Sequence, residues 1–375
     1  MFCHDHYGEI AMLLKLRNLR AGRQLGVLAL GTTLLSLPME SVLADVTLPP
    51  VSVGAGVRTS FTSTDPDFGE KASDFNLDSA RIYISGKITD KISLMFNTEY
   101  NSNSDKVGVI DAVARFEFSD KFNIWAGRFL PPSDRANLYG PYYASQWGVF
   151  NDGIQDGYPF ETTGRDDGVA YWGQFGIAKV SFGVFDVKGL TKATGTGDDN
   201  DVLAAGRVQL DFWDPEGGYY LNGTYYGEKD LLAVGVAAQT VSGDNAYSVD
   251  FLLEKKLAGS AVVTVEAEYA KYDGLGGYPS PIEDSYKKTD GFYVLGAYLF
   301  PQTVGIGKFQ VLGKYAQATY SYTALDVDQD TVELDVNYII KDFNARISLF
   351  YIDKSFDPDV GGDSKQIGIG LQVQI

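Results

Sequence analysis

Apolar and polar side chains alternate with a period of two along most of this sequence. The run at the end of the chain is the clearest, since Ile367, Ile369, Leu371, Val373 and Ile375 alternate with glutamines and glycines. Successive side chains of a β-strand point to opposite faces, so this segment has one aliphatic face and one face of small or amide side chains. The pattern predicts β-strands for nearly the whole chain.

Similar alternating segments begin near residues 92, 263, 292 and 331. Each is about ten residues long, which is the length a tilted strand needs to cross a bilayer. Several apolar faces end in Tyr or Phe, as aromatic girdles at the two membrane interfaces require. Strands of a soluble β-sandwich are usually shorter, about 5–6 residues. The sequence therefore predicts an all-β fold, a transmembrane antiparallel β-barrel whose apolar faces meet lipid. A soluble β-sandwich is the alternative.

The connections between these segments are alternately short and long, as in outer-membrane barrels with short periplasmic turns and longer external loops. A direct count gives seventeen strands. Assigning Tyr219–Tyr226 to a periplasmic connection at 214–230 restores the alternation, gives sixteen strands and places both termini in the periplasm. Sixteen strands enclose a lumen wide enough for water. The long connections are expected at 64–76, 101–107, 129–166, 188–201, 241–246, 272–289, 321–330 and 355–364.

The N-terminus has a different pattern. A basic cluster at 15–23 precedes the uncharged stretch 24–39 and the small-residue sequence 41–44. This order is that of a secretory signal peptide, whereas a membrane anchor would need about 20 apolar residues. We expect residues 1–44 to be cleaved and residues 45–375 to form the barrel.

Composition excludes several classes of function. The chain has one cysteine and two histidines, and all three (Cys3, His4 and His6) lie in the expected signal peptide. Disulfides, Cys/His metal sites and mechanisms that need a His base or a Cys nucleophile are therefore excluded. We expect no enzymatic activity and no cofactor, although a glycosidase that uses two carboxylates stays formally open. The net charge is −18 at pH 7, and nucleic acid is not an expected partner because phosphate binding needs a concentrated basic patch.

Four motifs, taken in their order along the chain, resemble the phosphate-selective porin O/P family: Arg81–Ile88, Ala126–Ser133, Asp211–Tyr220 and Gly227–Gly235. The resemblance implies a sixteen-stranded barrel in the outer membrane of a Gram-negative bacterium. It also implies a frequent homotrimer through which small solutes diffuse, and a long third loop that folds inward and narrows the pore. Two features depart from the family. The chain ends in Ile375 where an aromatic residue is common, and its acidic balance fits poorly with a phosphate preference.

The third long connection, 129–166, is the longest of all and is the expected constriction loop. An ordered loop of 38 residues is uncommon unless it has a function. An external flap is the alternative. The aromatic residues of the loop include Tyr139, Tyr142, Tyr143 and Trp147. The charged candidates for the constriction are Arg135, Asp152, Asp156, Glu161 and Arg165.

The alternation also assigns charged side chains to the lumen. The assignment of Arg128 depends on Trp125 and Phe129, which are the competing candidates for the outward face of the same strand. A basic track opposite an acidic one would orient dipolar solutes, and an arginine row favours anions. The alternative is that these charges only keep the wall wet. The basic candidates are Arg58, Arg81, Lys87, Arg115, Arg128, Lys179 and Arg207, and the acidic ones are Glu99, Asp111, Glu117, Asp211, Asp250, Glu254, Glu266, Glu268, Glu333 and Asp335.

The expected external loops are acidic, with clusters at 198–201 and 326–330. The second cluster resembles the start of a calcium loop but has Thr331 where glycine is needed and Asn337 where glutamate is needed. No metal site is expected there. A negative mouth enriches cations, so the mouth and the arginines of the lumen favour solutes of opposite sign.

These observations predict an outer-membrane porin for passive diffusion of small hydrophilic, charged solutes, with phosphate and other anions among the candidates. A structural or adhesive outer-membrane barrel without an open pore is the alternative. The expected partners are outer-membrane lipid, small solutes or ions, and further copies of the chain in a homotrimer.

Overall fold

The computed structural model describes residues 50–101, 106–149, 152–154, 164–186, 191–192, 195–196, 201–275 and 288–375. The expected signal peptide, residues 1–44, lies outside this part of the chain, so its cleavage stays a prediction.

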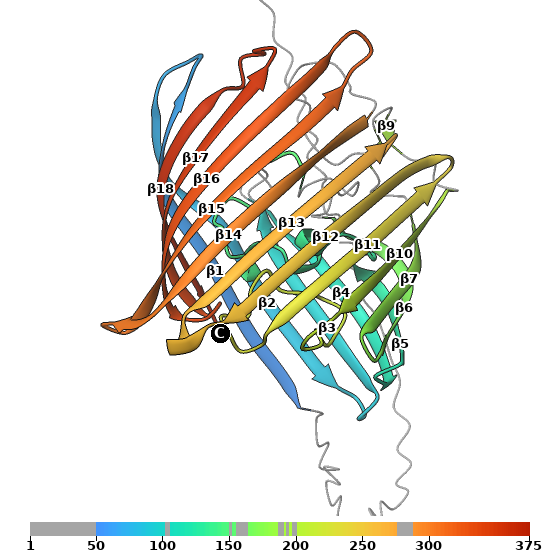
Figure 1. Ribbon diagram of the computed structural model, residues 1–375. Coiled ribbons are helices and arrows are strands. Elements are labelled where there is room, and N and C mark those ends of the chain that lie inside the picture. The colour runs from blue at the N-terminus through green and yellow to red at the C-terminus, as the bar shows by residue number, and fades with distance from the viewer. Residues whose placement is uncertain are drawn as a thin grey trace, which may run out of the picture. The chain divides into compact units, whose positions relative to one another are not determined.

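Sixteen strands pair with their neighbours to form a closed antiparallel barrel (Figure 1). The last strand closes the barrel by pairing with the first, and Phe61 lies opposite Ile369. β8 (Thr191–Lys192) and β9 (Gly195–Thr196) form a separate two-stranded sheet. The barrel strands are β1 (Val51–Pro66), β2 (Ala72–Lys87), β3 (Ile92–Asn101), β4 (Lys106–Ser119), β5 (Phe122–Phe129), β6 (Asp166–Phe175), β7 (Ala178–Asp186), β10 (Val202–Asp211), β11 (Leu231–Val241), β12 (Asp244–Lys256), β13 (Val262–Asp273), β14 (Lys288–Val304), β15 (Gly307–Ser321), β16 (Asp326–Lys341), β17 (Ala345–Asp357) and β18 (Ser364–Gln374).

The predicted fold class and strand number are confirmed. Residues 219–226 form no strand, and β10 and β11 are joined directly by residues 212–230. We call the end of the barrel that has this connection and the short turns the turn end, and the opposite end the loop end. Ala55 and Ile375 exchange main-chain hydrogen bonds of 3.2 and 2.9 Å, so the start of β1 and the C-terminus meet at the turn end.

Several strands are longer than the sequence predicted. The expected loop 64–76 is paired as far as Thr64 opposite Ala72, and the expected loop 321–330 is already strand from Asp326. In both places the apolar alternation stops before the main-chain pairing does. Hydrogen bonding between neighbouring strands therefore continues beyond the part of the wall that has an apolar outer face.

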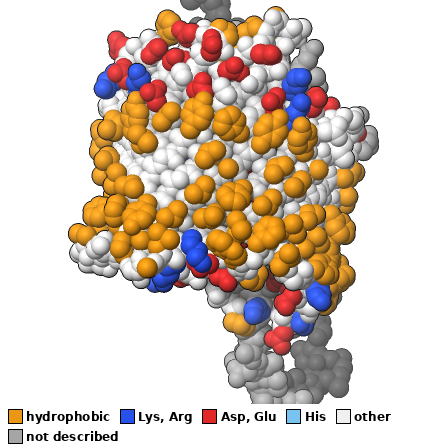
Figure 2. All heavy atoms as spheres, in the orientation of Figure 1, with side chains coloured by type: hydrophobic (Ala, Val, Ile, Leu, Met, Phe, Trp, Pro, Cys, Tyr) orange, Lys and Arg blue, Asp and Glu red, His pale blue; other side chains and the backbone are white. Residues whose placement is uncertain are grey.

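The two faces of the wall differ sharply in exposure. On β16, Leu334 is 54% exposed, whereas the next residue on each side, Glu333 and Asp335, is 1% and 2% exposed. Apolar side chains form a band around the visible face of the barrel, with charged side chains gathered beyond both of its edges (Figure 2). No helix in the described part of the chain is long and apolar enough to cross a membrane.

The hydrophobic core lies inside the barrel. Residues 130–165, which connect β5 to β6, form the long segment, and its described residues are mostly buried. Leu138 and Ile154 of the long segment belong to the same apolar cluster as Leu295 and Leu312 of the wall. An inner chain segment thus buries the apolar inward side chains of the strands.

Short helices shape the long segment and one turn. In α1 (Arg135–Tyr139), the Asp134 side chain accepts a hydrogen bond of 2.8 Å from the Asn137 N–H, which caps the N-terminus of the helix. Gly140 ends α1 with a φ of 62°, a conformation that favours glycine. The helix η1 (Pro141–Tyr143) follows it, and η2 (Ala258–Ser260) forms the turn between β12 and β13.

Candidate functional site: the barrel interior

The long segment first runs along the inner face of the wall formed by β10 to β13. The guanidinium of Arg207 donates to the Ser133 carbonyl at 3.1 Å, and Gln239 donates to the Pro132 carbonyl at 3.2 Å. Further on, the Tyr139 hydroxyl donates to the Glu266 carboxylate at 3.0 Å. Polar side chains of the wall thus hold the segment by its carbonyl groups and by one hydroxyl.

The segment then reaches the opposite side of the barrel. Arg346 on β17 donates to the carbonyls of Ala144 and Ser145 at 2.7 and 3.0 Å. Arg58 on β1 donates to the Trp147 carbonyl at 3.0 Å, and its guanidinium lies 4.2 Å from the centre of the Trp147 ring. Arg58, which the alternation placed in the lumen, and Arg346 therefore both bind the main chain of the long segment.

Carboxylates of β16 hold the same stretch through its N–H groups. The Trp147 N–H donates to Asp335 at 2.9 Å, and the Gly148 N–H donates to Glu333 at 2.6 Å. Charged groups that accept or donate several hydrogen bonds can be buried at tolerable cost. These two acidic residues are therefore part of the support of the segment.

Of the five residues predicted for the constriction loop, three belong to the described chain. Arg135 is fully buried, Asp152 pairs with Lys314 at 2.8 Å, and Arg165 pairs with Asp111 at 3.0 Å. Asp156 and Glu161 lie outside the described residues. That the loop narrows the pore stays a prediction.

Residues 212–230 form a second inner segment, which we call the insert. The carboxylate of Glu216 accepts a hydrogen bond of 2.9 Å from Arg135 and one of 2.7 Å from Gln209. The sequence placed these residues in a connection at the turn end and gave no indication that they enter the barrel. The signal available was Glu216 itself, a charged residue within an aromatic stretch that would need a partner if buried.

Most of the predicted pore-lining residues point inward and are buried in ion pairs or hydrogen bonds. Arg81 pairs with Glu99, and Lys179 donates to the Glu216 carbonyl at 3.0 Å. Arg207 forms a salt bridge with Asp250. The members of this buried inward set are Arg58, Arg81, Glu99, Asp111, Lys179 and Arg207.

Lys87, Arg115 and Glu117 also belong to the inward-facing positions but keep partial or full exposure. Arg115 lies 5.7 Å from the ring centre of Trp125, whose indole N–H donates to Glu117 at 3.2 Å. These three residues lie on β2 and β4, so the partly exposed charges gather on one side of the barrel.

The prediction for Arg128 was wrong. Its side chain faces outward and forms a salt bridge of 2.8 Å with Asp167. Trp125 and Phe129 take the inward face instead, because the Tyr219 ring of the insert packs on them at centroid distances of 4.7 and 5.7 Å. Alternation then forces Arg128 to the outer face. The sequence could not decide this, since the aromatic partner lies ninety residues away along the chain.

Sequence reasoning also missed Arg346. On β17 both faces are partly apolar, so the alternation was ambiguous. Arg346 lies opposite Gln372 of β18 in the register, and the polar face of β18 was evident from the sequence. Pairing the two last strands would have identified Arg346 as inward-facing.

The inner wall is covered unevenly. The inward side chains of β11 to β13 are buried beneath the two inner segments, including Asp250, Glu254 and Glu266. On β2 and β3, by contrast, Tyr83 and Asn97 keep partial exposure. The expected acidic track opposite a basic one therefore does not face water, because all of its residues except Glu117 are buried.

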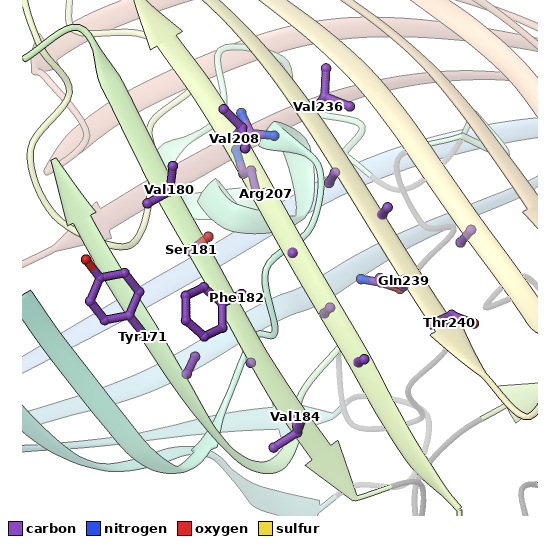
Figure 3. A pocket seen from close by; sticks show the side chains of 18 of the residues that line it. Tyr171, Val180, Ser181, Phe182, Val184, Arg207, Val208, Val236, Gln239 and Thr240 are labelled. Carbon is purple, nitrogen blue, oxygen red and sulfur yellow. The ribbon is translucent and has the colours of Figure 1, made fainter. Parts of the chain in front are cut away.

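A hollow of about 1080 Å³ lies on the other side of the wall, over β6, β7, β10, β11 and β12 (Figure 3). Its lining includes Phe182, Val208 and Val236, which are exposed, and Val180, which is half-buried and lies on the same outward face as Phe182. Since these positions face away from the barrel interior, this hollow is part of the apolar outer surface and not of the lumen.

The carboxyl group of Glu216, in the insert, is stabilised in its ionised form. Burial by itself raises the pKa of the Glu216 carboxyl, but the guanidinium of Arg135 and the ammonium of Lys179 more than offset this effect. The pKa of Glu216 falls to about 2. The ion pair between the two inner segments is therefore fully charged at neutral pH.

Comparisons with known proteins agree with this architecture. The family model for phosphate-selective porin O and P matches residues 51–141. The chain is an outer-membrane porin. The predicted family is thus confirmed over β1 to β5 and the start of the long segment, and the predicted location in the outer membrane of a Gram-negative bacterium is confirmed as well.

Solved structures show the same fold for most of the porin. OmpF of Salmonella typhi, in complex with daunomycin, is 14% identical, with a TM-score of 0.56, 87% of this chain covered and 98% of that chain. OprB of Pseudomonas putida, in a low-pH structure, is 7% identical, with a TM-score of 0.54 and coverages of 87% and 92%. OmpT of Vibrio cholerae is 13% identical, with a TM-score of 0.51 and coverages of 87% and 97%. None of the curated proteins matches the chain.

Proposed function

We propose that this porin is a passive, water-filled channel for small hydrophilic, charged solutes. The observation that carries the proposal is the uneven cover of the inner wall. Part of the inward face of β2 to β4 keeps access to solvent, at Tyr83, Asn97 and Arg115 among others, while the inward side chains of β11 to β13 are covered by the inner segments. Solutes then move along the β2 to β4 side, past Arg115 and Lys87.

The same arrangement supports a preference for anions, phosphate included. The covered carboxylates have no direct contact with a passing solute, whereas the Arg115 guanidinium, which binds oxyanions well, stands on the exposed side. Glu117 is the acidic neighbour that weakens this preference. The long segment narrows the path.

Reversal potentials in asymmetric KCl test the sign of the selectivity. The purified protein in a planar bilayer is expected to pass chloride more readily than potassium. A clear cation preference would remove phosphate and other anions from the proposed solutes and leave only the channel itself.

A structural or adhesive barrel without an open pore is the rival function. The large core inside the barrel favours it, since Leu295, Leu312 and Tyr293 are buried there. The two functions differ in one measurement. Protein that inserts into a bilayer yet carries no ion current would favour the structural barrel.

Three further properties belong to the proposal. The porin works without a cofactor and without enzymatic activity, since its only thiol and imidazoles lie in residues 3 to 6. It assembles as a homotrimer, which crosslinking of the protein in outer-membrane fractions would test. A dominant monomer after crosslinking would contradict the trimer without affecting the channel.

A further inference from the structure

We propose that the insert, residues 212–230, is a second constricting element, and that its ion pair with the long segment sets the width of the pore. The inference rests on the proposed function as a channel. Arg135 and Glu216 act as positioning residues in it, because they fix two chain segments and need not touch the solute.

The insert reaches several sides of the barrel. The Tyr220 hydroxyl donates to Asp111 on β4 at 2.9 Å. The Thr224 hydroxyl donates to Glu254 on β12 at 2.6 Å. The ring of Tyr226 lies 5.1 Å from that of Phe343, in the turn between β16 and β17. A segment with these three anchors extends across the interior and does not hang outside the turn end.

Main-chain hydrogen bonds join the insert to the long segment. The Leu221 N–H donates to the Leu138 carbonyl at 3.3 Å, and the Gly223 N–H donates to the Tyr143 carbonyl at 2.9 Å. The Tyr219 hydroxyl donates to the Leu130 carbonyl at 2.8 Å. The two segments therefore form one body inside the barrel, and neither can move without breaking these bonds.

A buried group of four charges lies where the two segments meet the wall. Arg135 donates from both terminal nitrogens to the Glu216 carboxylate, and Arg207 does the same to Asp250. The Nε of Arg135 lies 3.7 Å from Asp250, which links the two pairs. The Tyr225 hydroxyl completes the Glu216 site at 2.9 Å. Removal of either charge of the Arg135–Glu216 pair leaves its partner buried without its main counter-charge, which destabilises the arrangement.

The insert also borders the exposed side of the lumen. Tyr219 and Tyr220 pack on Trp125 at distances of 4.7 and 5.5 Å between ring centres. The guanidinium of Arg115 lies 5.7 Å from the centre of the same Trp125 ring. The anchor Asp111 is on the same strand as Arg115. Displacing the insert therefore opens space next to the path proposed for solutes.

Single-channel recording of the full mature protein tests this role. Glu216→Ala and Arg135→Ala are expected to raise the conductance by about twofold or more, because conductance grows with the open cross-section. Arg128→Gln is the matched control. It removes an arginine from a salt bridge as well, but on the outer face, and is expected to leave the conductance unchanged.

A disulfide distinguishes the position of the insert from a general loss of structure. A Cβ on Gly223 would lie 3.3 Å from the Ala144 Cα, so cysteines at these two positions, Ala144→Cys and Gly223→Cys, are near enough to be tested for a disulfide between the two segments. In the Arg135→Ala background, the oxidised pair is expected to return the conductance to near the wild-type value. Reduction is expected to raise it again.

Other results would overturn the inference. Wild-type conductance in both alanine variants, or no difference between the oxidised and reduced forms of the Arg135→Ala double-cysteine protein, would show that the insert does not set the pore width. If Arg135→Ala fails to fold, the cysteine pair is tested in the otherwise wild-type protein. Failure of that pair to form a disulfide would also overturn the inference. A wild-type protein without current would instead refute the proposed channel.

Discussion

Arg115 and Arg128 show how much depends on the face to which a single side chain belongs. Both are arginines of neighbouring strands, and both were predicted to line the lumen. Arg115 does point inward beside Trp125, whereas Arg128 forms an outward salt bridge with Asp167. Local alternation is enough for Arg115, but the face of Arg128 is decided by Tyr219, a contact that no local pattern contains.

Replacing Arg115 is expected to change ion selectivity. Arg115→Gln removes a positive charge from the exposed side of the inner wall and should lower the anion-to-cation permeability ratio by about twofold or more. Arg128→Gln, on the outer face, should leave the ratio unchanged. Reversal potentials in asymmetric KCl provide the measurement, and an equal effect of the two variants would contradict the assignment of faces.

Glu216 should make the inner ion pair resistant to acid. Its pKa is lowered from 4.5 to about 2 in the folded porin. A carboxyl with a lowered folded-state pKa contributes stability that is present above its unfolded value and lost as the pH falls through the folded value. The conductance ratio of Glu216→Gln to wild type should therefore be the same at about pH 7 and about pH 4.5, and should approach one only near pH 2. A ratio that already approaches one at about pH 4.5 would show an ordinary pKa.

Among the elements, the strands were the most predictable and the inner segments the least. The strands follow a period-two pattern because one face meets an apolar medium and the other does not, so β16 or β18 is evident from its own residues. The insert is held by Arg135, Asp111 and Phe343, which lie on three other elements. Its place inside the barrel is a product of these distant contacts and leaves no periodic trace in the sequence.

A charge on the lipid face of a central strand should destabilise the barrel. Leu334 is near the middle of β16 and exposed on the outer surface. Leu334→Arg is expected to lower the free energy of unfolding by about 2–4 kcal/mol, as an arginine near the bilayer midplane does. Leu334→Val serves as the control and should have a small effect. Denaturant unfolding in lipid vesicles measures both, and equal stability of the arginine variant and the wild type would place this face away from hydrocarbon.

On the scale of the whole molecule, the barrel combines an apolar outer band with an interior that is largely packed. The strand number followed from the parity of short and long connections, and it holds because a closed antiparallel barrel with both ends at one rim needs an even number of strands. The distribution of charge was harder to predict. The acidic and basic inward residues were expected to face each other across water, but the long segment binds Glu266 and Asp335, and both are buried.

Removing the signal peptide should leave a protein that needs lipid or detergent. The exposed apolar side chains, such as Phe75, Val53 and Ile369, form the outer surface of the barrel. Purified protein is expected to pellet with outer membranes and to aggregate when detergent is removed. A monodisperse protein in plain buffer would contradict an outer face that meets lipid.

Planar-bilayer recording from purified mature protein is the most direct test of a water-filled path along the β2 to β4 wall. We expect discrete current steps that increase linearly with voltage and with KCl concentration. Protein that inserts in the bilayer, as shown by protection of its strands from protease, but passes no ions would contradict the channel.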